Sequence, residues 1–211
     1  MNTYDILKNC GVVPVVVLSD AADAVPTAKA LLAGGINAME ITFRTAAAPE
    51  AISRVAEECP DMLVGAGTVI TAAQCEEAIF RGARFIVSPG LSEPVVHVAQ
   101  AHGLPVVPGC VTPTEIIRAM ELGLTVLKFF PAQVYGGLSA LKALAAPFGG
   151  ISFLPTGGVN AENLTVFLAA PFVWAVGGSW VCQKKDIEAH NFEKITALCR
   201  EAKAAAEKVR G

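Results

Sequence analysis

One lysine interrupts an otherwise uncharged, mostly apolar segment of this 211-residue chain. It is Lys128, in the run Leu-Thr-Val-Leu-Lys-Phe-Phe-Pro over residues 124–131. Burial penalises the charged ammonium form, and the neutral amine that burial favours can attack a ketone to form a Schiff base. The protonated imine then accepts the electrons of a breaking carbon–carbon bond. The segment therefore predicts imine chemistry at Lys128, and a lysine that only extends to solvent is the alternative.

A glutamate and an arginine stand in a second strand-like segment, Ala38–Arg44. Glu40, Thr42 and Arg44 alternate with apolar residues and so share one face of the strand. A buried glutamate can move protons as a general acid–base, and an arginine offers two parallel donors to a carboxylate. The alternatives are a structural ion pair of Glu40 with Arg44 or Lys128, and a surface position for Arg44.

Glycine pairs follow two later strand-like segments. They are Gly157-Gly158 and Gly177-Gly178, and Ser179 follows the second pair. Glycine loops at the start of helices leave backbone N–H groups free to bind phosphate. These residues therefore form a candidate phosphate site, although each pair alone is equally typical of a tight turn.

Eight short β-rich segments position these residues, with centres about 20 to 26 residues apart, which leaves room for one helix between neighbours. The segments are Val12–Leu18, Ala38–Phe43, Met62–Gly65, Phe85–Val87, Pro105–Val107, Thr125–Phe129, Ser152–Leu154 and Val173–Val176. Helices are expected over Ala21–Ala33, Ala72–Phe80, Pro113–Leu122 and Ala161–Ala170, from their composition and their capping residues.

This alternation predicts an α/β fold with parallel strands and crossover helices. For a short chain we expect a single (β/α)8 TIM barrel over residues 1–211, with a short helix at Tyr4–Asn9 and an extra helix at His190–Arg210. An open doubly wound sheet is the alternative. In a (β/α)8 barrel the active site lies at the carboxyl ends of the strands, and phosphate binds after strands seven and eight.

Residue parity predicts which side chains face the barrel interior. On the third strand we expect Val64, Ala66 and Thr68 to face inward. On the sixth strand we expect Lys128 and Phe130 to do so, because successive side chains of a strand alternate between its faces.

Composition excludes several classes of protein. The formal net charge is −3 and 53% of the residues are hydrophobic, so general disorder and a global attraction to nucleic acid or anionic membranes are not expected. No uncharged apolar run of about 18 residues occurs, so no membrane span is expected. Without a visible signal peptide, we expect a cytoplasmic protein.

The six cysteines and three histidines offer no ligand pattern. The cysteines are far apart and form no C-x-x-C pair, which favours buried free thiols. The histidines pair with neither Cys nor carboxylates at metal-ligand spacing. We therefore expect no metal site.

The sequence resembles the 2-keto-3-deoxy-6-phosphogluconate (KDPG) and 4-hydroxy-2-oxoglutarate (KHG) aldolase family. The segments that carry the likeness follow one another in family order along nearly the whole chain. They are Gly11-Val-Val-Pro-Val, Met39-Glu-Ile-Thr-Phe-Arg-Thr45, Val64-Gly-Ala-Gly-Thr-Val69, Ile86-Val-Ser-Pro-Gly90, Val107-Pro-Gly109, Lys128-Phe-Phe-Pro-Ala132, Pro155-Thr-Gly-Gly158 and Gly177-Gly-Ser-Trp180.

The resemblance implies a class I pyruvate aldolase, a carbon–carbon lyase that uses no metal or organic cofactor and is commonly a homotrimer. Its substrate would be a small 2-keto acid, with KDPG favoured and KHG as a second substrate. The implied roles are Schiff-base lysine for Lys128, general acid–base for Glu40, substrate binding for Arg44, Thr68, Pro89, Phe130 and Thr156, and phosphate binding for Gly157, Gly158, Gly178 and Ser179.

Two segments depart from the commonest family pattern. Gln133-Val134-Tyr135 stands where many relatives have Glu-Ala-Asn, and Phe43 stands where leucine is commoner. The first departure leaves the preferred aldehyde open. The other functions considered are an isomerase or epimerase with a phosphate site, a metal-dependent aldolase, and a non-catalytic sugar-phosphate binding protein.

Overall fold

Parallel strands form the centre of the molecule. The computed structural model describes residues 3–210. The strands are β1 (Val12–Val16), β2 (Ala38–Thr42), β3 (Leu63–Gly67), β4 (Ile86–Val87), β5 (Val106–Val107), β6 (Val126–Phe129), β7 (Ser152–Pro155) and β8 (Val176–Gly178). Six of them form a half-barrel in the order β5-β4-β3-β2-β1-β8, while β6 and β7 form a second, two-stranded sheet. Isolated bridges link the two sheets, at Gly109–Lys128, Phe153–Val173 and Thr156–Gly177.

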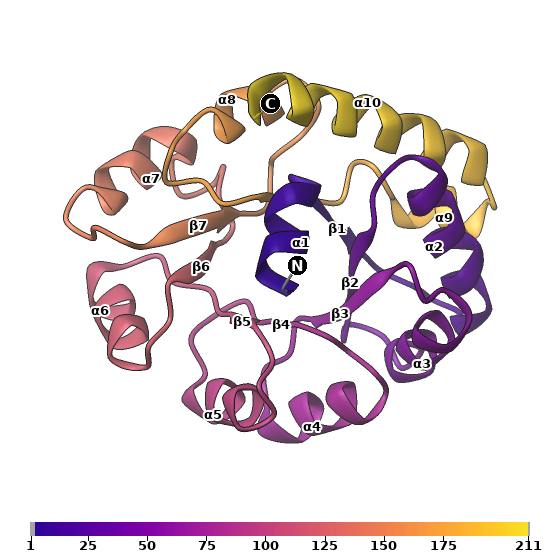
Figure 1. Cartoon of the computed structure of the whole chain (residues 1–211), viewed down its shortest axis with the longest axis horizontal. Coiled ribbons are helices and arrows are strands. Elements are labelled where there is room, and N and C mark those ends of the chain that lie inside the picture. The colour runs from indigo at the N-terminus through magenta and orange to yellow at the C-terminus, as the bar shows by residue number, and fades with distance from the viewer. Residues whose placement is uncertain (1–2, 211) are drawn as a thin grey trace.

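Helices surround the strands on the outside, except for the first helix, which lies over their centre (Figure 1). The helices are α1 (Thr3–Cys10), α2 (Ala24–Ala33), α3 (Ala48–Glu58), α4 (Ala72–Phe80), α5 (Glu93–Ala101), α6 (Pro113–Glu121), α7 (Gly137–Ala145), α8 (Leu164–Leu168), α9 (Lys184–Glu188) and α10 (Phe192–Arg210), and a 3₁₀ turn over Ala21–Asp23 precedes α2. This is the expected α/β fold with parallel strands. All four internal helices that the sequence predicts are present: α4 has the predicted bounds, and α2, α6 and α8 are shorter than predicted.

Local sequence explains where the helices begin. Thr112 caps α6 in a full capping box, in which its hydroxyl accepts from the Glu115 N–H and the Glu115 carboxylate accepts from the Thr112 N–H. Thr71 caps α4 more simply, with its hydroxyl accepting from the Gln74 N–H. Each cap ends the loop that leaves a strand, so it fixes the start of the following helix.

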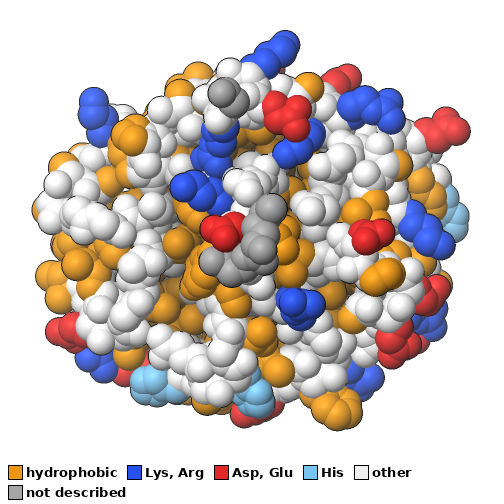
Figure 2. Space-filling view, in the orientation of Figure 1, with side chains coloured by type: hydrophobic (Ala, Val, Ile, Leu, Met, Phe, Trp, Pro, Cys, Tyr) orange, Lys and Arg blue, Asp and Glu red, His pale blue; other side chains and the backbone are white. Residues whose placement is uncertain are grey.

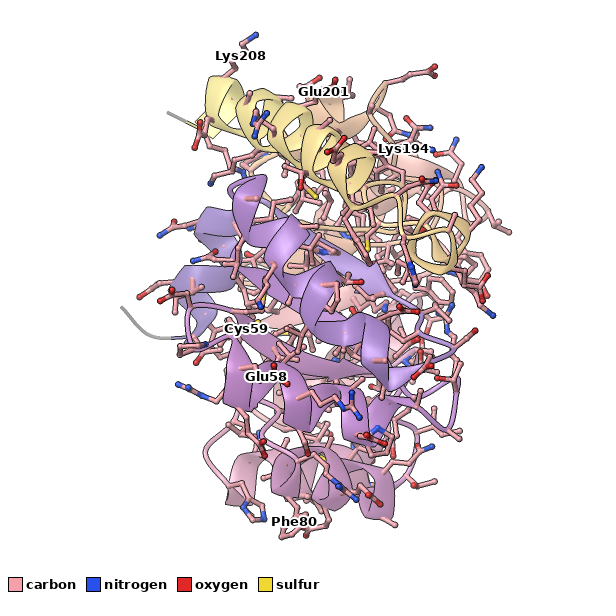
Figure 3. All side chains as sticks on the ribbon, turned by 90° about the vertical axis from the view of Figure 1, so that its right-hand side faces the viewer. Glu58, Cys59, Phe80, Lys194, Glu201 and Lys208 are labelled. Carbon is pink, nitrogen blue, oxygen red and sulfur yellow. The ribbon has the colours of Figure 1, made fainter. Side chains whose placement is uncertain are left out.

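Helix α10 shows the amphipathic pattern of a helix that packs on the outside of the fold. Ile195, Cys199, Ala202 and Ala206 recur at helical spacing and are buried. Figure 3 shows Lys194, Glu201 and Lys208 on the opposite, solvent side of this helix. The buried stripe packs against α2 and α8.

The amino ends of the strands are covered by α1, which lies over the centre of the ring in Figure 1. Beside it is a hollow of about 490 Å³ whose lining includes Lys8, Lys203 and Arg210, and Figure 2 shows basic side chains gathered on this face. Arg210 donates to the carbonyl oxygens of Trp174 (2.7 Å) and Val173 (2.8 Å). Arg210 therefore ties the end of α10 to the segment that leads into β8.

Two element predictions were wrong. Strand β8 begins at Val176 rather than at Val173, which makes only an isolated bridge. On β3 the interior face is Gly65 and Gly67, not Val64 and Ala66, because Glu40 pairs with Gly65 in the parallel register and paired residues point to the same side. The prediction placed the residues with side chains on the interior face and overlooked the glycines, which have none.

All six cysteines are buried free thiols, as expected. Within residues 3–210, no group of three or more His, Cys, Asp or Glu side chains could hold a metal ion. No helix of that part of the chain is long and apolar enough to cross a membrane.

Candidate active site

A buried amine and a buried carboxylate meet between the two sheets. Lys128 Nζ on β6 lies 3.4 Å from Glu40 Oε1 on β2, and the two residues are 3% and 0% exposed. Glu40 Oε2 is also buried and has no hydrogen-bond partner among the residues described. Since an unpaired buried oxygen is costly, the pair leaves one carboxylate oxygen for a water or a substrate group.

Arg44 and Thr68 form a second polar group at the carboxyl ends of β2 and β3. Arg44 Nε donates to Thr68 Oγ1 at 3.1 Å. Thr68 has a φ of 56°, in the left-handed region that a β-branched residue rarely adopts. This backbone turn follows Gly67 directly, so the Thr68 hydroxyl reaches Arg44 although strict strand parity would direct it elsewhere. The strain marks a residue held for its contacts.

Phe130 and Pro89 lie around Lys128. The Phe130 ring centroid is 5.4 Å from Lys128 Nζ, and the Phe130–Pro131 peptide bond is cis. Pro89 packs its carbonyl group against Gly109, which in turn bridges to Lys128. An aromatic face beside the amine excludes water and favours a cation there.

The loops after β7 and β8 start side by side, because Thr156 bridges to Gly177. Thr156 is buried, whereas Gly158 and Ser179 are exposed. Gly157 and Gly158 both have positive φ, at 89° and 86°, where glycine is needed. Gly178 proves to be the last residue of β8, and the Trp180 ring occupies the space that a Cβ would take there. The structure thus brings the glycine pairs together at one end of the fold.

Sequence reasoning missed Gly67, and it took Gly177 only as part of a phosphate loop. A Cβ on Gly67 would overlap the Glu40 carboxylate, and a Cβ on Gly177 would overlap the Thr156 side chain. Each glycine lies in a strand beside a polar interior side chain. The signal that could have found them is a glycine within a predicted strand, which marks a close approach by another group.

These features define an α/β protein with an amine–carboxylate site at the carboxyl ends of parallel strands. The family model described as KDPG and KHG aldolase matches residues 3–198. The chain belongs to this family.

Three relatives illustrate the likeness. The chain is 46% identical to the 2-dehydro-3-deoxy-phosphogluconate aldolase of Treponema pallidum over 198 residues, 94% of each chain. It is 44% identical to the KHG/KDPG aldolase of Escherichia coli K12 over 197 residues, 93% of this chain and 92% of the relative. The crystal structure of the Legionella pneumophila KDPG aldolase, with pyruvate captured at low pH as a covalent carbinolamine intermediate, superposes with a TM-score of 0.91 at 38% identity and covers 96% of this chain and 98% of that one.

Proposed function

We propose that this protein is a class I aldolase that cleaves KDPG to pyruvate and glyceraldehyde 3-phosphate, and also cleaves KHG to pyruvate and glyoxylate. The observation that carries the proposal is the buried Lys128–Glu40 pair, with Nζ and Oε1 3.4 Å apart. The carbinolamine trapped in the Legionella relative supports a covalent amine mechanism.

Lys128 Nζ attacks the C2 carbonyl of the 2-keto acid, and the resulting carbinolamine loses water to give an iminium ion. The C4 hydroxyl then gives its proton to a base, the C3–C4 bond breaks, and its electron pair moves to the iminium nitrogen. The aldehyde leaves, and protonation at C3 converts the enamine into the pyruvate imine. Water hydrolyses this imine and releases pyruvate and the free lysine.

Glu40 is the group we assign to the proton transfers, because its buried carboxylate lies within reach of the amine. Arg44 and Thr68 are assigned to the substrate carboxylate, with the Pro89 turn beside them. Phe130 forms the aromatic wall next to the imine, and Thr156 binds the part that becomes the aldehyde. No metal or organic cofactor is needed for this sequence of steps.

The phosphate of KDPG is assigned to Gly157, Gly158, Gly178 and Ser179. The adjacent starts of the two loops and their exposure at one end of the fold support this assignment. KHG lacks the phosphate, so it would use the same amine chemistry without that contact.

The test is to treat the protein with pyruvate and sodium borohydride and to measure its intact mass and peptide map. Reduction of the imine should add the mass of one reduced pyruvate at Lys128. Lys128→Ala should abolish the label and reduce turnover by several orders of magnitude. An unchanged mass, with turnover retained in Lys128→Arg, would favour an isomerase or epimerase instead.

At the level of the whole chain we propose one domain over residues 1–211, in which the two sheets close into a (β/α)8 barrel. Backbone hydrogen bonds across both seams support closure, among them Cys110 N–H to Lys128 O (2.9 Å) and Trp174 N–H to Phe153 O (2.8 Å). We further propose a cytoplasmic homotrimer that binds neither nucleic acid nor membranes. Self-association is supported by exposed hydrophobic side chains near the groove between α6 and α7, namely Ile117, Met120, Val134 and Tyr135. Measuring the molar mass in solution by light scattering would test the trimer.

A further inference from the structure

The interior face of β3 has no side chain where it passes Glu40. Gly67 is a regular strand residue that accepts a hydrogen bond from the Phe43 N–H at 2.7 Å. A Cβ built on it would lie 2.5 Å from Glu40 Cδ and closer still to Oε1. Oε1 is also the oxygen that lies 3.4 Å from Lys128 Nζ. The carboxylate thus reaches the lysine by lying directly over Gly67.

Backbone conformation does not explain this glycine. The φ of Gly67 lies outside the left-handed region, so an alanine could adopt the same backbone without strain. Its three nearest obstacles are all atoms of Glu40. Gly65 in the same strand is different, because there a Cβ would overlap the ring of Phe85, which is a matter of core packing.

We propose that Gly67 is a positioning residue for the reaction: it leaves the space in which the Glu40 carboxylate is held against Lys128. This inference rests on the proposed aldolase function. A methyl group at residue 67 would displace the carboxylate across the interior. Proton transfer would then slow, because general acid–base catalysis requires hydrogen-bond reach. The lysine itself would remain able to form the imine.

The first experiment measures Gly67→Ala in two assays. Pyruvate release from KDPG should fall roughly 10- to 10³-fold in kcat, part of the usual share of general acid–base catalysis. Exchange of the C3 hydrogens of pyruvate for deuterium should fall by a similar factor, and its pH profile should shift. Borohydride with pyruvate should still label Lys128. Gly149→Ala is the matched control, since a Cβ there meets nothing within 4 Å, and it should behave as the wild type.

The second experiment repeats the substitution in the Glu40→Asp background. The shorter acid removes one methylene and makes room for the new methyl group, so Gly67→Ala should cost at least about tenfold less there. Equal losses in the two backgrounds would overturn the inference, and so would wild-type kcat and exchange rates in Gly67→Ala. Borohydride labelling of Lys128 in the wild type would still support the aldolase function in either case. Absence of that label in the wild type would overturn both.

Thermal unfolding covers the case in which Gly67→Ala folds poorly. The substitution should lower Tm when Glu40 is present and have little effect in the Glu40→Ala background, where the obstacle is gone. The same loss of Tm in both backgrounds would assign Gly67 to general packing and contradict the positioning role.

Discussion

Glu40 offers the sharpest test at the scale of single residues. Its Oε2 is buried without a partner in the described part of the chain, and its Oε1 faces Lys128. Glu40→Gln keeps the size of the side chain but removes the base. We expect kcat for pyruvate release to fall by roughly 10² to 10⁴, with the borohydride label on Lys128 retained.

The control for this variant is Glu162→Gln, at an exposed position in the loop before α8. It should leave kcat unchanged. A loss of less than tenfold in Glu40→Gln would reassign Glu40 to a structural ion pair.

Single residues differ in how well the sequence predicts them. Lys128 and Glu40 could be predicted because an isolated charge in an apolar strand needs an explanation. The sequence does not give the distance between these two side chains, which come from β6 and β2 and meet across the interior. Gly67 could not be predicted by looking for chemical groups, since its contribution is the absence of a side chain.

At the scale of elements, the loop after β8 tests the phosphate assignment. Ser179 is exposed directly after β8, and the neighbouring loop after β7 contains Gly157. Ser179→Ala removes a hydroxyl donor worth about 1 kcal/mol, so the KM for KDPG should rise roughly fivefold. The KM for KHG should not change. Steady-state kinetics with the two substrates decides this, and equal effects on both would refute a phosphate role for Ser179.

The segment after β6 lies against the same loops. The Gln133 N–H donates to Gly157 O at 3.0 Å, and the Gln133 side chain fills the space beside Gly158. Gln133→Ala removes the end of this side chain and leaves the loop at Gly158 less tightly packed, so we expect the KM for KDPG to rise roughly fivefold, from a loss of about 1 kcal/mol of packing. The KM for KHG serves as the comparison and should not change. An unchanged KM for KDPG would separate this segment from the phosphate site.

Element boundaries were predictable where a local signal exists. Thr71 and Thr112 are N-cap residues that mark the starts of α4 and α6, and both starts agree with the structure. Strand β8 was misplaced because the apolar run at Val173 looks more strand-like than Gly177-Gly178. Glycine is needed at both positions, because the Thr156 side chain takes the space beside Gly177 and the Trp180 ring takes the space beside Gly178. Such a tertiary requirement leaves no local signal in the sequence.

At the scale of the whole molecule, the alternation of strands and helices predicts parallel topology, because each crossover needs a helix. The arrangement of the strands in a six-stranded half-barrel and a two-stranded sheet does not follow from that alternation. It depends on short ladders at β4 and β5 and on single bridges at the seams. The candidate site spans those seams, so its geometry is a property of the assembled fold.

The buried thiols make the stability of the whole fold depend on pH. Burial raises the pKa of the Cys110 thiol to about 12, with repulsion from Glu115 adding to it, and burial raises that of Cys75 to about 11. An unfolded cysteine has a pKa of about 8.5. Their contribution to stability is therefore complete below about pH 8.5 and is lost as the pH rises towards 11 to 12, because the unfolded chain releases protons that the folded chain keeps.

Urea denaturation at pH 8 and pH 10 measures this dependence. We expect the unfolding free energy of the wild type to be lower at pH 10, with a slope of up to about 1.4 kcal/mol per pH unit for each buried thiol in this range. Cys110→Ala removes one such group, so its stability should fall less between the two pH values. An identical fall in wild type and variant would mean that lysines and tyrosines, rather than this thiol, control alkaline unfolding. Because the six cysteines are distributed from α1 to α10, the dependence should appear as a single cooperative transition whose midpoint moves with pH.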